Sequence, residues 1–233
     1  GLRIDHVDGL LDPGQYLRTI RHSLPDTYML VEKILDLDEQ LPPSCPVQGT
    51  TGYDFQQRIT SLFCPQNNAE QFQEIYSQFT GYVADYDNLL SDKKRLMIGK
   101  ELAGDVDNLA HQLKLVSARD RYGVDITLYG LRRALVEILA RFPVYRTYIT
   151  PQGLNPEDEE YLQQAADRAA EAFPRLANEF SFIRRFLFLQ GWQRLTEEER
   201  RQWMEFVLRF QQLCSPIMAK GFEDTFLYVY NRL

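Results

Sequence analysis

The chain has 233 residues, a hydrophobic content of 44% and a formal net charge of −7. This length suits one large domain or two small ones, with enough apolar residues for a sizeable core. The acidic balance argues against nucleic acid and anionic membranes as partners, and no apolar run approaches the length of a transmembrane helix. The three cysteines, Cys45, Cys64 and Cys214, lack the spacing of a metal site and fit a reducing compartment. Composition therefore predicts a cytoplasmic globular protein.

The first part of the chain has the pattern strand, helix, strand. Two short apolar runs, Gly1–Asp5 and Tyr28–Glu32, flank a predicted helix over residues 11–24, and each run ends in a carboxylate. Two strands joined by a helix are expected to pair in parallel. Since parallel strands point the same way, Asp5 and Glu32 should emerge at the same carboxyl edge of the sheet. That edge is where α/β folds hold their chemistry.

Two carboxylates at one sheet edge are the equipment of a retaining glycosidase, in which they lie roughly 5–5.5 Å apart. Asp5 would be the nucleophile and must stay ionised, and Arg3 on the same strand face is placed to hold it so. Glu32 would be the general acid/base and must start protonated, which partial burial favours. From spacing alone, two solvated or ion-paired carboxylates remain an alternative. Metal binding by Asp5, His6 and Asp8 is a weaker one, because neighbouring strand residues point to opposite faces.

Helices are expected to dominate the chain from Asp54 onward, with one further strand. The run Val144–Ile149 alternates and is rich in β-branched and aromatic residues, which predicts a strand. Gln48–Gly52 is predicted as a loop. The apolar stripes at 55–63 and 72–79 are expected to be buried against neighbouring helices. The predicted helices span residues 54–63, 68–79, 83–117, 127–142, 155–173, 175–190, 196–210 and 222–233, with interruptions at Pro216 and Gly221 before the last one.

Five segments in order resemble the α-amylase superfamily and, within it, the maltooligosyl trehalose synthases. GLRIDH at residues 1–6 resembles the nucleophile motif at the end of barrel strand four, and VEKIL at 31–35 resembles the acid/base motif of strand five. The other three segments are PVQGTTGYDF at 46–55, FPVYRTY at 142–148, and RFQQ, MAKGFEDT and YNRL at 209–212, 218–225 and 230–233. The resemblance covers essentially the whole chain.

The resemblance implies a mainly α-helical fold containing a fragment of a (β/α)8 barrel from the region of strands four to six. Residues 1–52 would be the βαβ segment of the barrel. Residues 53–233 would be a large helical subdomain with the one further strand near 144–149. The chain would then be an internal piece of a longer enzyme. No segment matches the superfamily's third carboxylate, which lies in a His-Asp motif.

The resemblance also implies an activity. The longer enzyme would be a (1→4)-α-D-glucan 1-α-D-glucosylmutase, which converts the reducing-end α-1,4 linkage of a maltooligosaccharide to an α,α-1,1 linkage by retaining intramolecular transglycosylation. It would be monomeric and need no cofactor or metal, and this piece of it alone is expected to be inactive. Two alternatives remain open: a related α-glucan hydrolase or glucanotransferase, and a non-catalytic helical binding module.

The candidate site residues follow from these motifs. Asp5 and Glu32 are the candidate catalytic pair. Tyr53 is either a core residue or a platform on which a sugar ring stacks. Arg146 is either a contact to the sugar or a member of a buried ion pair. Lys220 lies in a charged turn that either lines a polyhydroxyl site or caps a helix. The candidate substrate-binding residues are Arg3, His6, Tyr53, Arg146 and Lys220.

Overall fold

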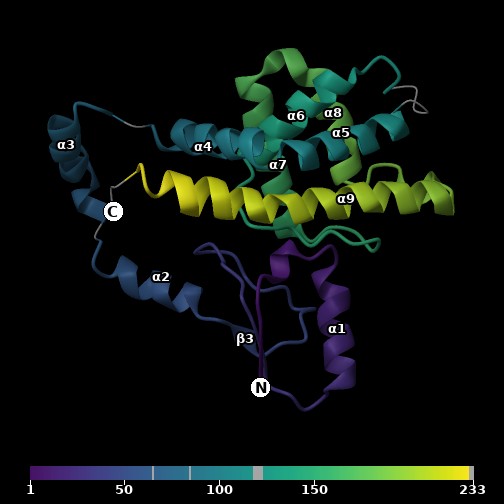
Figure 1. The fold of residues 1–233 in the computed structure, drawn as a ribbon, viewed down its shortest axis with the longest axis horizontal. Helices are drawn as coiled ribbons and strands as arrows, with labels where there is room; N and C mark the ends of the chain where they lie inside the picture. The colour runs from purple at the N-terminus through teal and green to yellow at the C-terminus, as the bar shows by residue number, and fades with distance from the viewer. Residues whose placement is uncertain (65, 84, 118–122, 231–233) are drawn as a thin grey trace.

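The computed structural model describes residues 1–64, 66–83, 85–117 and 123–230. A small sheet with one flanking helix lies on one side of the long helix α9 (Glu197–Ile217), and most other helices lie on the opposite side (Figure 1). The predicted mainly helical class is confirmed. None of the described helices is long and apolar enough to cross a membrane.

The sheet has three short parallel strands in the order β1-β2-β3. Strands β1 (Leu2–Ile4) and β2 (Met29–Val31) pair in parallel, and helix α1 (Pro13–Ser23) makes the crossover between them, as predicted. Strand β3 (Gly49–Thr50) pairs with β2 on its other side. The prediction of a loop at this third position is therefore wrong. A strand of two residues is too short to show an alternating pattern of apolar and polar residues. Hydrogen bonds to the neighbouring strand β2 define β3 instead.

The apolar side chains form two separate clusters. The smaller cluster has Val7, Leu17, Met29 and Val31 at its centre, so it lies between the sheet, α1 and the turn after β1. The larger cluster belongs to the helices. These two clusters support, as a proposal, a division of the chain near residue 52.

Six helices enclose the larger cluster. The predicted single helix over 83–117 is divided into α4 and α5 at residues 101 and 102. Thr196 and Glu199 form a capping box at the start of α9, where the sequence predicts a helix beginning at residue 196. The six helices are α4 (Tyr86–Lys100), α5 (Ala103–Ser117), α6 (Leu128–Ala140), α7 (Pro156–Ala172), α8 (Ala177–Leu187) and α9, with the short 3-10 turns η3 (Pro174–Leu176) and η4 (Trp192–Arg194) between them.

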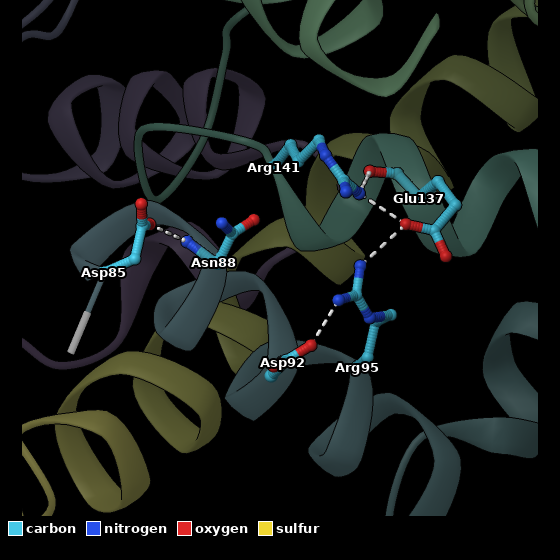
Figure 2. Close-up of polar contacts among 6 residues, drawn as sticks. All are labelled: Asp85, Asn88, Asp92, Arg95, Glu137 and Arg141. Atoms are coloured by element: carbon cyan, nitrogen blue, oxygen red, sulfur yellow. Dashed lines mark hydrogen bonds and ion pairs between the residues drawn. The ribbon is translucent and has the colours of Figure 1, made fainter. Parts of the chain in front are cut away.

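One carboxylate joins α4 to α6. Glu137 is buried on α6, and its Oε2 accepts a hydrogen bond of 2.9 Å from Nη1 of Arg95 on α4 (Figure 2). The same oxygen accepts from Arg141, the residue that follows α6, and Arg95 also bonds Asp92. The two arginines neutralise a carboxylate that would be costly to bury alone.

The chain does not break at Pro216 and Gly221. Pro216 lies inside α9, which continues directly into a π-helix, η5 (Met218–Phe226). The prediction of a separate last helix over 222–233 is wrong for the described residues, and 231–233 lie outside them. Gly221 is buried against α4, where an added Cβ would lie 2.8 Å from the Cα of Lys94. This glycine therefore allows close packing rather than ending a helix.

Residues 144–149 do not form the predicted strand. The amide of Tyr148 donates to Asp158 Oδ2 (3.0 Å), and the amide of Ile149 donates to Gln211 Oε1 (2.6 Å). The side-chain Nε2 of Gln211 also donates to the carbonyl of Ile149. Side chains thus take the place of a neighbouring strand. Nearly all of this segment is buried, so its apolar pattern reflects burial on both sides and not membership of a sheet.

Helices α2 (Tyr53–Ser61) and α3 (Ala69–Thr80) extend away from the rest of the molecule, with the short turn η2 (Gln66–Asn68) before α3 (Figure 1). Neither helix contains a buried residue. Phe55, Phe63 and Phe79 have exposed fractions of 68%, 80% and 90%. The expectation that these apolar stripes are buried against neighbouring helices is therefore wrong in this structure.

Candidate active site

Strands β1 and β2 bring Asp5 and Glu32 to one edge of the sheet. Ile4 is paired with Val31 in the parallel register, so the two carboxylate residues directly follow a matched pair. The amide of Glu32 also donates to the carbonyl of Ile4 at 2.8 Å. The two side chains are therefore held at adjacent strand ends.

Arg3 contacts both carboxylates. Its Nη1 lies 2.5 Å from Oδ1 of Asp5 and its Nη2 lies 3.7 Å from Oε1 of Glu32. The amide of His6 donates to Glu32 Oε2 at 2.8 Å. The side chain of Asp5 is 69% exposed and that of Glu32 is 24% exposed. One carboxylate is thus open to an incoming ligand, while the other is more sheltered and is oriented by a backbone donor.

The turn after Asp5 is tight. His6 has a left-handed backbone with φ of 49°, which is uncommon for a residue other than glycine. The chain then enters the 3-10 turn η1 (Val7–Gly9). The imidazole of His6 packs so closely on Gly9 that a Cβ there would lie 2.1 Å from Nε2. A side chain at position 9 would therefore force the imidazole of His6 to move.

A buried ion cluster lies behind this turn. The ammonium of Lys33 lies 3.0 Å from Oδ2 of Asp8 and 2.8 Å from Oε1 of Glu39, and all three side chains are at most 6% exposed. The hydroxyl of Tyr148 donates to Asp8 Oδ1 at 2.5 Å, and the Lys33 ammonium lies 5.6 Å from the centre of the Tyr148 ring. The cluster connects the end of β2 to the turn that follows β1.

Burial and pairing set the charges in this cluster. Burial lowers the pKa of Lys33, but Asp8 and Glu39 together raise it above its ordinary value. Burial raises the pKa of Glu39 in spite of the neighbouring ammonium. Burial and Asp8 raise the pKa of the Tyr148 hydroxyl, so it remains a neutral donor. The ammonium of Lys33, the residue after Glu32, is thus a buried cation held by two acidic side chains and a tyrosine.

Sequence reasoning missed Lys33 and Glu39. For Lys33 a signal existed, because Met29, Val31 and Lys33 are two residues apart and share one strand face. Met29 and Val31 are fully buried, so the third member of that face is expected inside as well. No comparable local pattern marks Glu39, which lies in the irregular segment after β2.

Arg146 is buried and bonds backbone carbonyls. It is only 2% exposed, which argues against direct contact with a sugar. Its guanidinium donates to the carbonyls of Asp8 (2.8 Å), Leu10 and Leu11 (2.8 Å), so its partners are backbone oxygens and not a carboxylate. Arg146 therefore fixes the turn that carries Asp5 into α1.

The remaining predicted residues lie on the surface. Tyr53 is 40% exposed at the first position of α2, so it is not a core residue. Lys220 is exposed and forms an ion pair of 2.7 Å with Asp224, while Glu223 accepts from the hydroxyl of Tyr145. Neither Tyr53 nor Lys220 forms a hydrogen bond or ion pair with Asp5 or Glu32 within the described part of the chain. The described residues contain no cluster of three or more His, Cys, Asp or Glu side chains that fits a metal ion.

Comparisons with known proteins extend these observations. No protein-family model matches the chain. A putative maltooligosyl trehalose synthase of Mycobacterium tuberculosis is 30% identical over 235 residues, an alignment that covers 100% of this chain and 27% of that protein. The solved maltooligosyltrehalose synthase of Arthrobacter ramosus is 31% identical, with a TM-score of 0.80 over 100% of this chain and 27% of that one.

A hypothetical maltooligosyl trehalose synthase of Sulfolobus tokodaii gives a TM-score of 0.67 at 28% identity, over 99% of this chain and 26% of that one. The chain thus spans about a quarter of the length of the relatives that it matches. In both sequence and fold, these 233 residues are similar throughout to one internal quarter of the maltooligosyl trehalose synthases, as the motifs predicted.

Proposed function

We propose that this chain carries the nucleophile and the acid/base residue of a retaining transglycosylase that acts on maltooligosaccharides. The observation that carries the proposal is the arrangement of Arg3, Asp5 and Glu32 at the ends of two adjacent parallel strands. The names of the relatives support the substrate class. We further propose that β1, β2 and β3 are consecutive strands of a (β/α)8 barrel that the longer protein completes.

The reaction would proceed in two displacements. In the first, Asp5 attacks the anomeric carbon of the penultimate glucosyl unit while Glu32 protonates the glycosidic oxygen, so the terminal glucose leaves and a glycosyl ester forms on Asp5. In the second, the anomeric hydroxyl of the retained glucose attacks the same carbon. Glu32 takes the proton of that hydroxyl and Asp5 departs. Two inversions retain the configuration, and an α,α-1,1 linkage replaces the reducing-end α-1,4 linkage.

The surrounding residues would position these groups. The amide of His6 orients Glu32, and Arg3 lies within reach of both carboxylates and of a sugar hydroxyl. Tyr53 and Lys220 are proposed as outer contacts to the saccharide because both are accessible. The covalent intermediate must be kept from water if glucose is to be the acceptor. Because the chain spans a quarter of its relatives and lacks a third carboxylate motif, we expect the 233-residue chain alone to be inactive.

The test uses the full-length natural polypeptide that contains these residues. With maltopentaose, the activity should remove reducing ends without releasing glucose, whereas a hydrolase would create reducing ends. Glu32→Gln should lower turnover by about 10²–10⁴-fold, the usual contribution of a general acid. Fluoride leaves without protonation, so the Glu32→Gln variant given an α-maltosyl fluoride should accumulate a glycosyl adduct on Asp5 that mass spectrometry detects.

Two control variants complete this experiment. Asp5→Asn should form no adduct, and Glu160→Gln, at an exposed position on α7, should behave as the parent. An adduct on any residue other than Asp5, or normal turnover by Asp5→Asn, would contradict the proposed mechanism.

A further inference from the structure

A large groove lies between α5 and α9 and reaches the turn that follows Asp5. Its volume is about 930 Å³, at the upper end of the range of ligand pockets. His6 and Gly9 line one end of it. His6 directly follows Asp5, and its amide bonds Glu32. The side chain of Gln212 on α9 donates to the carbonyl of Gly9 at 2.7 Å and ties the turn to the wall of the groove.

The two helices line this groove with polar side chains at helical spacing. On α5, Asp105, Asn108 and Gln112 recur every three or four residues, and on α9 Arg201, Glu205 and Arg209 do the same. Apolar side chains line the groove as well, which lets it contact carbon as well as oxygen atoms of a ligand. The apolar lining residues are Leu102, Leu109, Leu115, Val116, Leu213 and Pro216.

Several polar side chains in the groove form no hydrogen bond or ion pair within the described part of the chain. No hydrogen bond or ion pair joins the side chains of Asp105, Asn108, His111, Gln112 and Arg209 to any described residue. Together they offer negatively charged, positively charged and neutral hydrogen-bonding groups. A groove lined by one sign of charge would suit an ion, whereas this mixture suits a neutral ligand with many hydroxyl groups. The hydroxyl groups and C–H surfaces of a glucosyl chain match this mixed polar and apolar lining.

We propose that this groove binds the glucosyl units of an α-glucan that lie beyond the linkage being rearranged. The proposal rests on the proposed function, because it places the reacting end of the chain at Asp5 and Glu32. His6 would be the shared wall between the reacting end and the groove. The residues that determine how long a glucan the site accepts are then on α5 and α9, and the strands carry only the chemistry.

The test measures binding to the 233-residue chain, which contains all of the lining residues named above. Maltopentaose is titrated into the ¹⁵N-labelled chain, and amide shifts are followed by NMR. Shifts should map to α5 and α9, and glucose should bind at least 10-fold more weakly. A His111→Ala/Arg209→Ala variant should bind maltopentaose at least 5-fold more weakly than the wild type. Arg175→Ala, an exposed arginine on η3 outside the groove, should bind as the wild type does.

The outcomes separate this inference from the proposed function. Shifts confined to the strand ends, no shifts at all, or unchanged binding by the double variant would overturn the assignment of the groove. The adduct on Asp5 would still form in each of these cases if the proposed function is right. Loss of that adduct together with shifts on α5 and α9 would instead leave a glucan-binding groove without the proposed chemistry.

Discussion

Replacing Lys33 by methionine tests whether the buried ion cluster holds the candidate site together. Methionine keeps most of the volume of the side chain but removes the ammonium that lies 3.0 Å from Asp8 and 2.8 Å from Glu39. Both carboxylates would then be buried without a cation, at 6% and 5% exposure. Removing one partner of a buried ion pair typically costs about 3–5 kcal/mol. Because a domain is stable by only about 5–15 kcal/mol, this is a large fraction of the total.

The loss of stability in Lys33→Met should be local to the sheet and should depend on pH. Since about 1.4 kcal/mol corresponds to a factor of ten, the amides of Met29–Val31 should exchange about two to four orders of magnitude faster in Lys33→Met. In the variant, the two uncompensated carboxylates take up protons more readily when folded than when unfolded. Stability of the variant therefore rises as the pH falls, and its deficit should be smaller at pH 5 than at pH 7.

Hydrogen exchange followed by NMR measures the local effect, and the exchange of Trp192 and Trp203 reports separately on the helical core. Lys220→Met removes an exposed ion pair and is the matched control, which should leave exchange in β2 unchanged. A triple variant in which Asp8 and Glu39 are also replaced by their amides should regain part of the protection. Exchange rates in Lys33→Met within fivefold of wild type, or a deficit that is equal at both pH values, would refute the reasoning.

Two further predictions concern other buried cations. Arg146→Met should leave the carbonyls of Asp8, Leu10 and Leu11 without a donor, which costs about 1–3 kcal/mol for each group that stays buried. Hydrogen exchange should become faster at the start of α1, while the core around Trp203 keeps its protection. Equal loss of protection in both regions would contradict this prediction. Burial lowers the pKa of Lys94 to about 7, and its ammonium donates to the carbonyl of Phe142. Its unfolded pKa is about 10.4, so wild-type stability should rise relative to Lys94→Met by up to about 1.4 kcal/mol per pH unit between pH 7 and pH 9. Parallel pH profiles of the two proteins in denaturant titrations would contradict this expectation.

The sequence by itself determined the local structure wherever the signal is local. The spacing of apolar and acidic residues predicted β1, α1 and β2, and with them the placement of Asp5 and Glu32 at one edge. The caps at Asn155 and Thr196 marked the starts of α7 and α9, because capping depends on groups within three residues of each other. The quoted motifs pointed to the maltooligosyl trehalose synthases before any fold was known.

Only the tertiary structure decided how distant segments meet. The alternation over 144–149 predicted a strand, but the side chains of Asp158 and Gln211 bond that backbone instead. Proline and glycine predicted a break where the helix continues, because the packing of Gly221 on Lys94 is a contact between distant residues. Lys33 and Arg146 gained their roles in the same way, from partners six to 138 positions along the chain. Such contacts depend on the free energy of the assembled core, which no window of neighbouring residues contains.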